Sequence, residues 1–145
     1  MKKTGAEFLS FTFNIAKLFR LVSNLVQEVF SDNGFKFTNE QLWVLLLLWE
    51  KQGVNQQYIG NKLMRDKATI SHLVNVLESK KIVYRVSDPR DERQKLIHLT
   101  DAGEEMKVQV SPSLWSALGE VPSLLPKGDH KDFGRILELL VLNFS

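Results

Sequence analysis

The middle of the chain constrains the fold most, because its hydrophobic pattern changes from helical to strand spacing within a short stretch. Asn55 and Asp66 are strong helix N-caps that each precede a run with helical spacing, which predicts two short consecutive helices. Two β-branched or apolar runs follow, Ile82–Val86 and Lys95–Leu99, and the charged segment 87–94 separates them. A helix, a tight turn, a second helix and a charged hairpin come in the order of a winged helix-turn-helix.

The second of these helices has two contrasting faces. Its apolar residues lie three and four positions apart and form one stripe for burial: Ile70, Leu73, Val74 and Leu77. The opposite face carries only short or hydrogen-bonding side chains: Ala68, Ser71, His72 and Asn75. An ordinary solvated face is richer in long charged side chains, so this face is predicted to approach a binding partner closely.

Two helices are predicted before this region. Apolar residues at steps of three and four indicate a long amphipathic helix from Ala6 to Phe30. Thr38 and Gln41 form a capping box in front of a helix that runs to about Gln52. The apolar run Leu42–Trp49 within it is far shorter than the ~20 residues that a membrane span needs, so it is expected to be a buried helix segment.

Two more helices are predicted after the hairpin. Thr100 is expected to cap a helix that reaches about Ser111, with a bend or joint at Pro112. Asp129 is expected to cap a last helix that is apolar on nearly every side. A helix of this kind must be covered, and a monomer of this size has little surface with which to cover it.

The first and last helices are therefore predicted to form a homodimer interface. The residues expected at this interface are Phe8, Phe11, Ile15, Phe133, Ile136, Leu137, Leu140 and Phe144. The fold class that follows is mainly α, with a small wing of two or three strands and dimerisation helices at both ends of the chain.

Positive charge is concentrated in the middle of the chain. Residues 62–95 hold nine Lys and Arg residues against five Asp and Glu residues, whereas the formal net charge of the whole chain is +2. A basic segment in a neutral or acidic frame is expected where a protein meets a polyanion. On charge alone a solvated surface is the more common explanation, so the pattern of individual residues has to decide.

Residue usage argues against an enzyme, a metal site and a cofactor. The chain has no cysteine, which excludes disulfides, thiolate ligands and a cysteine nucleophile, and which favours the cytoplasm. His72, His98 and His130 lie far apart and have no histidine partner at the spacing of one helical turn. The sequence contains no G-x-S-x-G, no glycine-rich phosphate loop and no nucleophile–base set. Charged residues interrupt any apolar leader near the N-terminus, so neither a secretory signal nor a membrane association is expected.

Two motifs make the pattern specific. The segment Asp88–Arg93 reads D-P-R-D-E-R, and Leu99–Gly103 reads L-T-D-A-G. A D-P-x-D-x-R wing followed by L-T-x-x-G at the next helix resembles the MarR family of transcription regulators. The flanking apolar helices match that family in order and length, so the resemblance extends over nearly the whole chain.

The resemblance implies a single domain over residues 1–145 that acts as a homodimer on a pseudo-palindromic DNA operator. Residues 38–100 would form the DNA-binding lobe, and residues 6–31 and 101–145 would supply interlocking dimerisation helices. A repressor released by a small-molecule effector is the expected mode of regulation.

The resemblance also implies roles for individual residues. The major groove would be met by Lys67, Ala68, Thr69, Ser71, His72 and Asn75, and asparagine is able to pair bidentately with adenine. Phosphates would be met by Lys62, Arg65, Arg85 and Arg90. Arg93 would enter the flanking minor groove, with its guanidinium oriented by a bidentate pair to Asp91.

Two positions depart from the family pattern. His72 stands where the family often has arginine, which leaves open both a phosphate or guanine contact there and its dependence on pH. Lys81 stands where the family usually has glycine, so a left-handed backbone there would cost roughly 1 kcal/mol.

Two alternatives stay open at this point. A winged-helix module that binds a partner protein instead of DNA would have the same fold, although it is expected to expose aromatic anchors. Trp43, Trp49 and Trp115 are expected to pack in the core, and the alternative is that they line an effector pocket.

Overall fold

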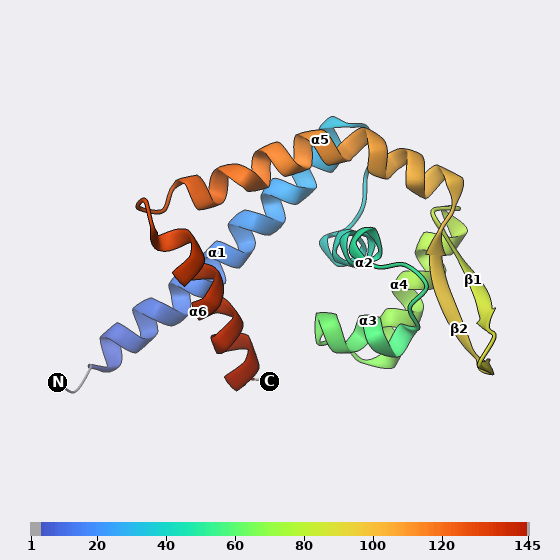
Figure 1. Cartoon of the computed structure of the whole chain (residues 1–145), viewed down its shortest axis with the longest axis horizontal. Coiled ribbons are helices and arrows are strands. Elements are labelled where there is room, and N and C mark those ends of the chain that lie inside the picture. The colour runs from blue at the N-terminus through green and yellow to red at the C-terminus, as the bar shows by residue number, and fades with distance from the viewer. Residues whose placement is uncertain (1–3, 145) are drawn as a thin grey trace.

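The chain divides into a helical arm and a lobe that carries the wing, which Figure 1 shows at opposite ends of the molecule. The computed structural model describes residues 4–144. Their elements are α1 (Gly5–Asp32), α2 (Asn39–Glu50), α3 (Gln56–Leu63), α4 (Lys67–Ser79), β1 (Val83–Asp88), β2 (Asp91–Leu99), α5 (Asp101–Ser123) and α6 (Asp129–Phe144). This order confirms the predicted fold class. In Figure 1, α5 runs from the wing to the arm formed with α1 and α6.

Capping side chains start four of the helices, as predicted. Asn55 and Asp66 each accept a hydrogen bond of 2.8 Å from a backbone N–H three residues later. Thr38 and Thr100 accept equivalent bonds of 3.3 and 3.1 Å. The prediction for Asp129 was wrong by one position, because α6 begins at Asp129 itself.

Pro112 does not end the helix in which it lies. α5 continues from Asp101 to Ser123 with Pro112 and Pro122 inside it. Met106, Val110 and Leu114, on both sides of Pro112, are almost fully buried. Their burial offsets the hydrogen bond that proline cannot donate.

One apolar core joins the lobe to the inner half of the arm. α2 supplies much of it, and the predicted apolar stripe of α4 is buried against it. The other members come from the end of α1, from α3, from the base of the wing and from the first half of α5. The core therefore fixes α3, α4 and the wing relative to one another.

The wing is longer than the sequence predicted. β1 and β2 pair antiparallel from Val83 opposite Leu99 to Asp88 opposite Asp91, which leaves only Pro89 and Arg90 at the tip. Most of the charged segment 87–94 is therefore strand and not loop. The outer half of β2 is exposed to solvent, so side chains on both of its faces can be polar. The alternation of apolar and polar residues that marks a half-buried strand is therefore missing there.

Lys81 adopts the left-handed conformation considered above, with a φ of 60°. It follows the end of α4, where its N–H donates to the carbonyl of Glu78 and the next N–H donates to that of Leu77. These bonds satisfy the free carbonyls of the last turn. The chain turns into β1 at this point.

Much of the apolar surface on the arm is exposed in a single chain. All the residues predicted at the dimer interface are exposed except Phe133, which is half-buried. α1 also exposes Leu9, Phe13, Phe19 and Leu21, so its outer half is apolar over more of its surface than the predicted stripe. Within residues 4–144, no helix is long and apolar enough to cross a membrane.

The three tryptophans have different environments. Trp49 is buried and stacks on Phe30 with ring centroids 5.3 Å apart, as expected for a core residue. Trp43 stacks on Phe19 with centroids 6.1 Å apart. Trp115 is 55% exposed, so the prediction that it packs in the core was wrong for a single chain.

Candidate nucleic-acid interface

α4 presents the expected polar face to solvent. Ala68, His72 and Asn75 are exposed and Ser71 is half-buried, whereas the opposite stripe is buried. Lys67 at the start of the helix is exposed as well. The face has little steric bulk near its middle, so another macromolecule can approach the α4 backbone closely.

The N-terminus of α4 is organised by Asp66. Its carboxylate accepts a 2.8 Å bond from the backbone N–H of Thr69 and a 2.9 Å bond from the Thr69 hydroxyl. These bonds, the backbone one first, lower the pKa of Asp66 below its usual value. Because the Thr69 hydroxyl donates its one proton to Asp66, its oxygen can only accept hydrogen bonds from any other partner.

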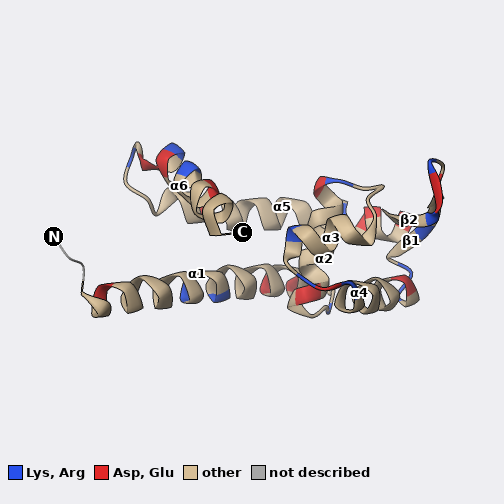
Figure 2. Cartoon of the chain, turned by 90° about the horizontal axis from the view of Figure 1, so that it is seen from below, with Lys and Arg blue, Asp and Glu red and all other residues tan. Residues whose placement is uncertain are grey.

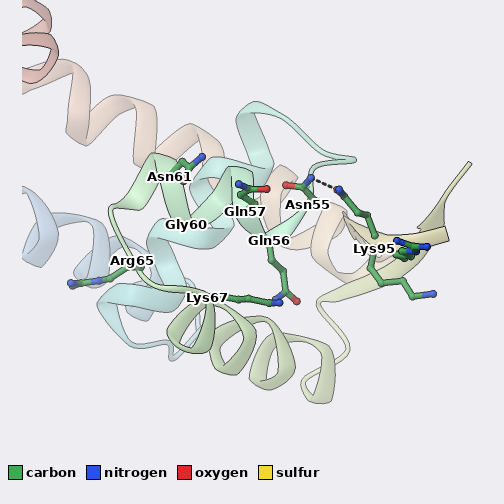
Figure 3. Close-up of a pocket in the computed structure, with 10 residues that line it drawn as sticks. Asn55, Gln56, Gln57, Gly60, Asn61, Arg65, Lys67 and Lys95 are labelled. Carbon is green, nitrogen blue, oxygen red and sulfur yellow. Dashed lines mark hydrogen bonds between the residues drawn. The ribbon is translucent and has the colours of Figure 1, made fainter. Parts of the chain in front are cut away.

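A polar hollow of about 550 Å³ lies between α3, the start of α4 and β2 (Figure 3). Its lining contains four cationic side chains, Arg65, Lys67, Arg93 and Lys95, and no Asp or Glu. The remaining lining residues are Asn55, Gln56, Gln57, Gly60, Asn61 and Gln94. The fold thus places Lys67 and Arg93, from the helix and the wing, on one concave surface that suits a polyanion.

The turn at the tip of the wing is held by Asp88 and not by Asp91. Asp88 is buried, and its carboxylate accepts bonds from the backbone N–H and the Nε of Arg90, at 2.9 and 3.4 Å. This role of Asp88 was not predicted from the sequence, although an Asp before Pro is typical of a side chain that bonds the backbone two residues later.

Asp91 contacts Arg93 differently from the prediction. Its Oδ1 accepts a 3.1 Å bond from the backbone N–H of Arg93, so the predicted guanidinium pair is absent from the described residues. The short Asp side chain reaches the nearby backbone first. Arg93 is exposed on β2, and Figure 2 shows the charged residues gathered on this outer part of the wing.

The four basic residues predicted to meet phosphates are held in different ways. Arg65 pairs with Glu40 of α2 at 2.7 Å, and about half of each side chain is exposed. Arg90 is almost fully exposed despite its contact with Asp88. Lys62 lies over the Tyr58 ring at 6.0 Å from its centroid.

Arg85 differs from the other three, because it is largely enclosed and bonded to side chains of α3 and α4. A phosphate contact by Arg85 stays a prediction, and in this structure its guanidinium is already bonded within the protein. Its partners lie up to 29 positions away in sequence, so no local pattern identified them.

No cluster of three His, Asp or Glu side chains suited to a metal ion occurs within residues 4–144. His98 stacks on Tyr84 with centroids 5.5 Å apart, whereas His72 and His130 are exposed. The polar groups that converge in this part of the molecule are therefore those of the hollow and of the α4 face.

Comparison with known sequences gives a consistent result. Residues 37–95 match the model of the MarR family. The transcriptional regulator MgrA of Staphylococcus aureus is 30% identical over 125 residues, which cover 83% of this chain and 82% of MgrA. The regulator TtmR of Methylorubrum extorquens is 42% identical over 72 residues, which are half of this chain and only 37% of TtmR.

Solved structures extend the likeness to the fold of the whole chain. The complex of Staphylococcus aureus MepR with DNA has a TM-score of 0.76 at 25% identity and covers 98% of this chain and 99% of that one. CouR of Rhodococcus jostii bound to p-coumaroyl-CoA has a TM-score of 0.75 at 26% identity, over 88% and 89% of the two chains. The chain therefore belongs to the MarR family, whose members are transcriptional regulators and not enzymes.

Proposed function

We propose that this protein binds duplex DNA in a sequence-specific manner as a homodimer in the cytoplasm and represses transcription. The observation that carries the proposal is the cationic hollow, because it lies between α3, the start of α4 and the wing. Residues 38–100 act as the DNA-binding lobe, and residues 6–31 and 101–145 form the dimer. The likeness to MepR, which was solved with DNA, supports this assignment.

In the proposed complex the uncharged face of α4 lies in the major groove, and the wing directs Arg93 into the flanking minor groove. Ala68, Ser71, His72 and Asn75 are short enough for the helix to enter a groove about 12 Å wide. The DNA backbone between the two grooves passes over the hollow, where Arg65 and Lys95 neutralise phosphate charge.

Release by a small-molecule effector completes the proposal. The likeness to CouR, which was solved with p-coumaroyl-CoA, supports a ligand-responsive regulator.

The rival function is a winged-helix module that binds another protein. Such a surface is expected to centre on aromatic anchors. The exposed face of α4 contains no Phe, Tyr or Trp within Lys67–Ser79, and its neighbour is the cationic hollow. Both features favour DNA.

Selection from a random duplex library tests the function. The full-length protein is expected to enrich an inverted repeat whose half-sites are centred about 10 base pairs, or a multiple of that, apart. Recovery of unrelated sequences after repeated rounds would contradict sequence-specific binding.

Arg93→Ala is expected to weaken binding to the selected site, to lower the slope of log K against log salt by about one, and to erase any preference for flanking A·T pairs. The reason is that Arg93 is exposed beside the hollow and suits a narrow, electronegative minor groove. Fluorescence anisotropy at several salt concentrations measures all three effects. If Arg93→Ala keeps the flank preference while Arg90→Ala loses it, Arg90 is the minor-groove residue.

A further inference from the structure

Arg85 connects the wing to both helices of the helix-turn-helix. Its guanidinium on β1 donates to Oδ1 of Asn75 on α4 at 2.7 Å and to Oε1 of Gln56 on α3 at 3.1 Å, and it pairs with Glu78. Only 19% of the Arg85 side chain is exposed. The guanidinium is thus held from three directions by side chains that come from two helices.

This contact decides how the amide of Asn75 is turned. Guanidinium has five donors and no acceptor, so the atom of Asn75 that faces it must be the oxygen. A hydrogen bond with a charged partner is about twice as strong as one between neutral groups, so Oδ1 is held firmly. Within residues 4–144 the Nδ2 group of Asn75 donates no hydrogen bond, and Asn75 is exposed on the α4 face.

We infer that Arg85 is a positioning residue that turns the Nδ2 donors of Asn75, and not its oxygen, toward the bases. Pairing with adenine needs both the oxygen and the nitrogen of an asparagine amide. Oδ1 keeps a second lone pair, but Arg85 fixes the direction in which this oxygen points. The groups that Asn75 can direct at a base are therefore its two N–H donors, which suit N7 and O6 of guanine or O4 of thymine. The bidentate adenine contact considered from the sequence is thereby replaced, and Arg85 sets base preference without touching a base.

The other partners of Arg85 keep this arrangement in place during binding. Glu78 neutralises the charge of the guanidinium, which reduces the attraction of Arg85 to a DNA phosphate and so favours its contact with Asn75. Gln56 holds it from the side of α3. The inference rests on the proposed function, because it requires that α4 enters the major groove.

The test compares affinities for the four base pairs at the single half-site position whose preference disappears in Asn75→Ala. The wild-type protein is expected to favour guanine or thymine over adenine by about 5- to 150-fold, the range of one good base contact. Arg85→Met frees Oδ1 and is expected to shift the preference toward adenine. Arg90→Met removes the same charge from the wing and is expected to lower affinity without changing the order of the bases.

Asn75→Asp keeps an acceptor for Arg85 but removes both donors, so it is expected to lose the preference for guanine or thymine. This variant decides the question if Arg85→Met melts or fails to dimerise. Preference for adenine in the wild type, an unchanged base order in Asn75→Asp, or an unchanged order in folded Arg85→Met would overturn the inference. So would the absence of any position that responds to Asn75→Ala. Failure of the wild type to select any site would instead contradict the proposed function itself.

Discussion

Removal of residues 129–145 is expected to leave a monomer at micromolar concentration and to weaken binding to a two-half-site operator by about 100-fold or more. α6 has no buried residue in a single chain, and the apolar outer half of α1 is exposed in the same way. These surfaces are expected to cover each other between two chains. Sedimentation velocity measures the first effect and anisotropy with the selected duplex measures the second.

Substitutions within α6 separate loss of the interface from loss of the helix. Leu137→Lys combined with Leu140→Lys places charges in the proposed interface and is expected to reproduce the truncation. Glu138→Lys places the same side chain at a position that is already charged, so it is expected to leave the dimer intact. A truncated chain that still sediments as a dimer would refute the role proposed for α6.

Gly103→Ala is expected to lower the free energy of unfolding by about 1–3 kcal/mol, the usual cost of overpacking. A Cβ at Gly103 would lie 2.4 Å from the carbonyl oxygen of Ile82 and 3.2 Å from the Leu99 side chain. That carbonyl already accepts bonds from the backbone and the hydroxyl of Thr100, at 2.9 and 3.1 Å, so it cannot move away freely. The final glycine of the L-T-x-x-G motif is thus required for close packing of α5 on the turn before β1.

Chemical denaturation followed by circular dichroism, at one protein concentration, checks this prediction. Ala102→Ser is the matched control, because it adds one heavy atom at the neighbouring exposed position. Its effect is expected to lie within about 0.5 kcal/mol of zero. Equal stability of Gly103→Ala and the control would show that α5 adjusts to the added methyl group.

Local chemistry made several features of the fold predictable. Asn55, Asp66 and Thr100 bond to backbone groups three residues away, so a short stretch of sequence contains everything that determines these caps. The apolar stripe of α4 was predictable for the same reason, because helical spacing alone places it on one face.

Features that depend on contacts between distant segments were not predictable from the sequence. The length of the wing depends on the pairing of β1 with β2, and the charged residues there gave no signal of it. Asp91 was predicted to pair with the guanidinium of Arg93, but its short side chain accepts a hydrogen bond from the backbone N–H of Arg93 instead. Trp115 carries an apolar side chain that the single chain leaves uncovered.

The candidate site shows the same division. The exposed face of α4 followed from helical spacing, whereas the hollow exists only because Lys67 and Lys95 are brought together by the core. The role of Arg85 depends on Gln56, Asn75 and Glu78, which no spacing rule connects to β1.

Anisotropy titrations of the full-length protein with the selected duplex and with a random duplex, each at two salt concentrations, test sequence-specific DNA binding most directly. The selected duplex is expected to bind at least about 10³-fold more tightly than the random one. Affinity for both is expected to fall steeply with salt, by about 10³ or more between roughly 50 and 200 mM if six or more phosphates are contacted. Equal affinity for the two duplexes, or binding that does not respond to salt, would contradict the proposed function.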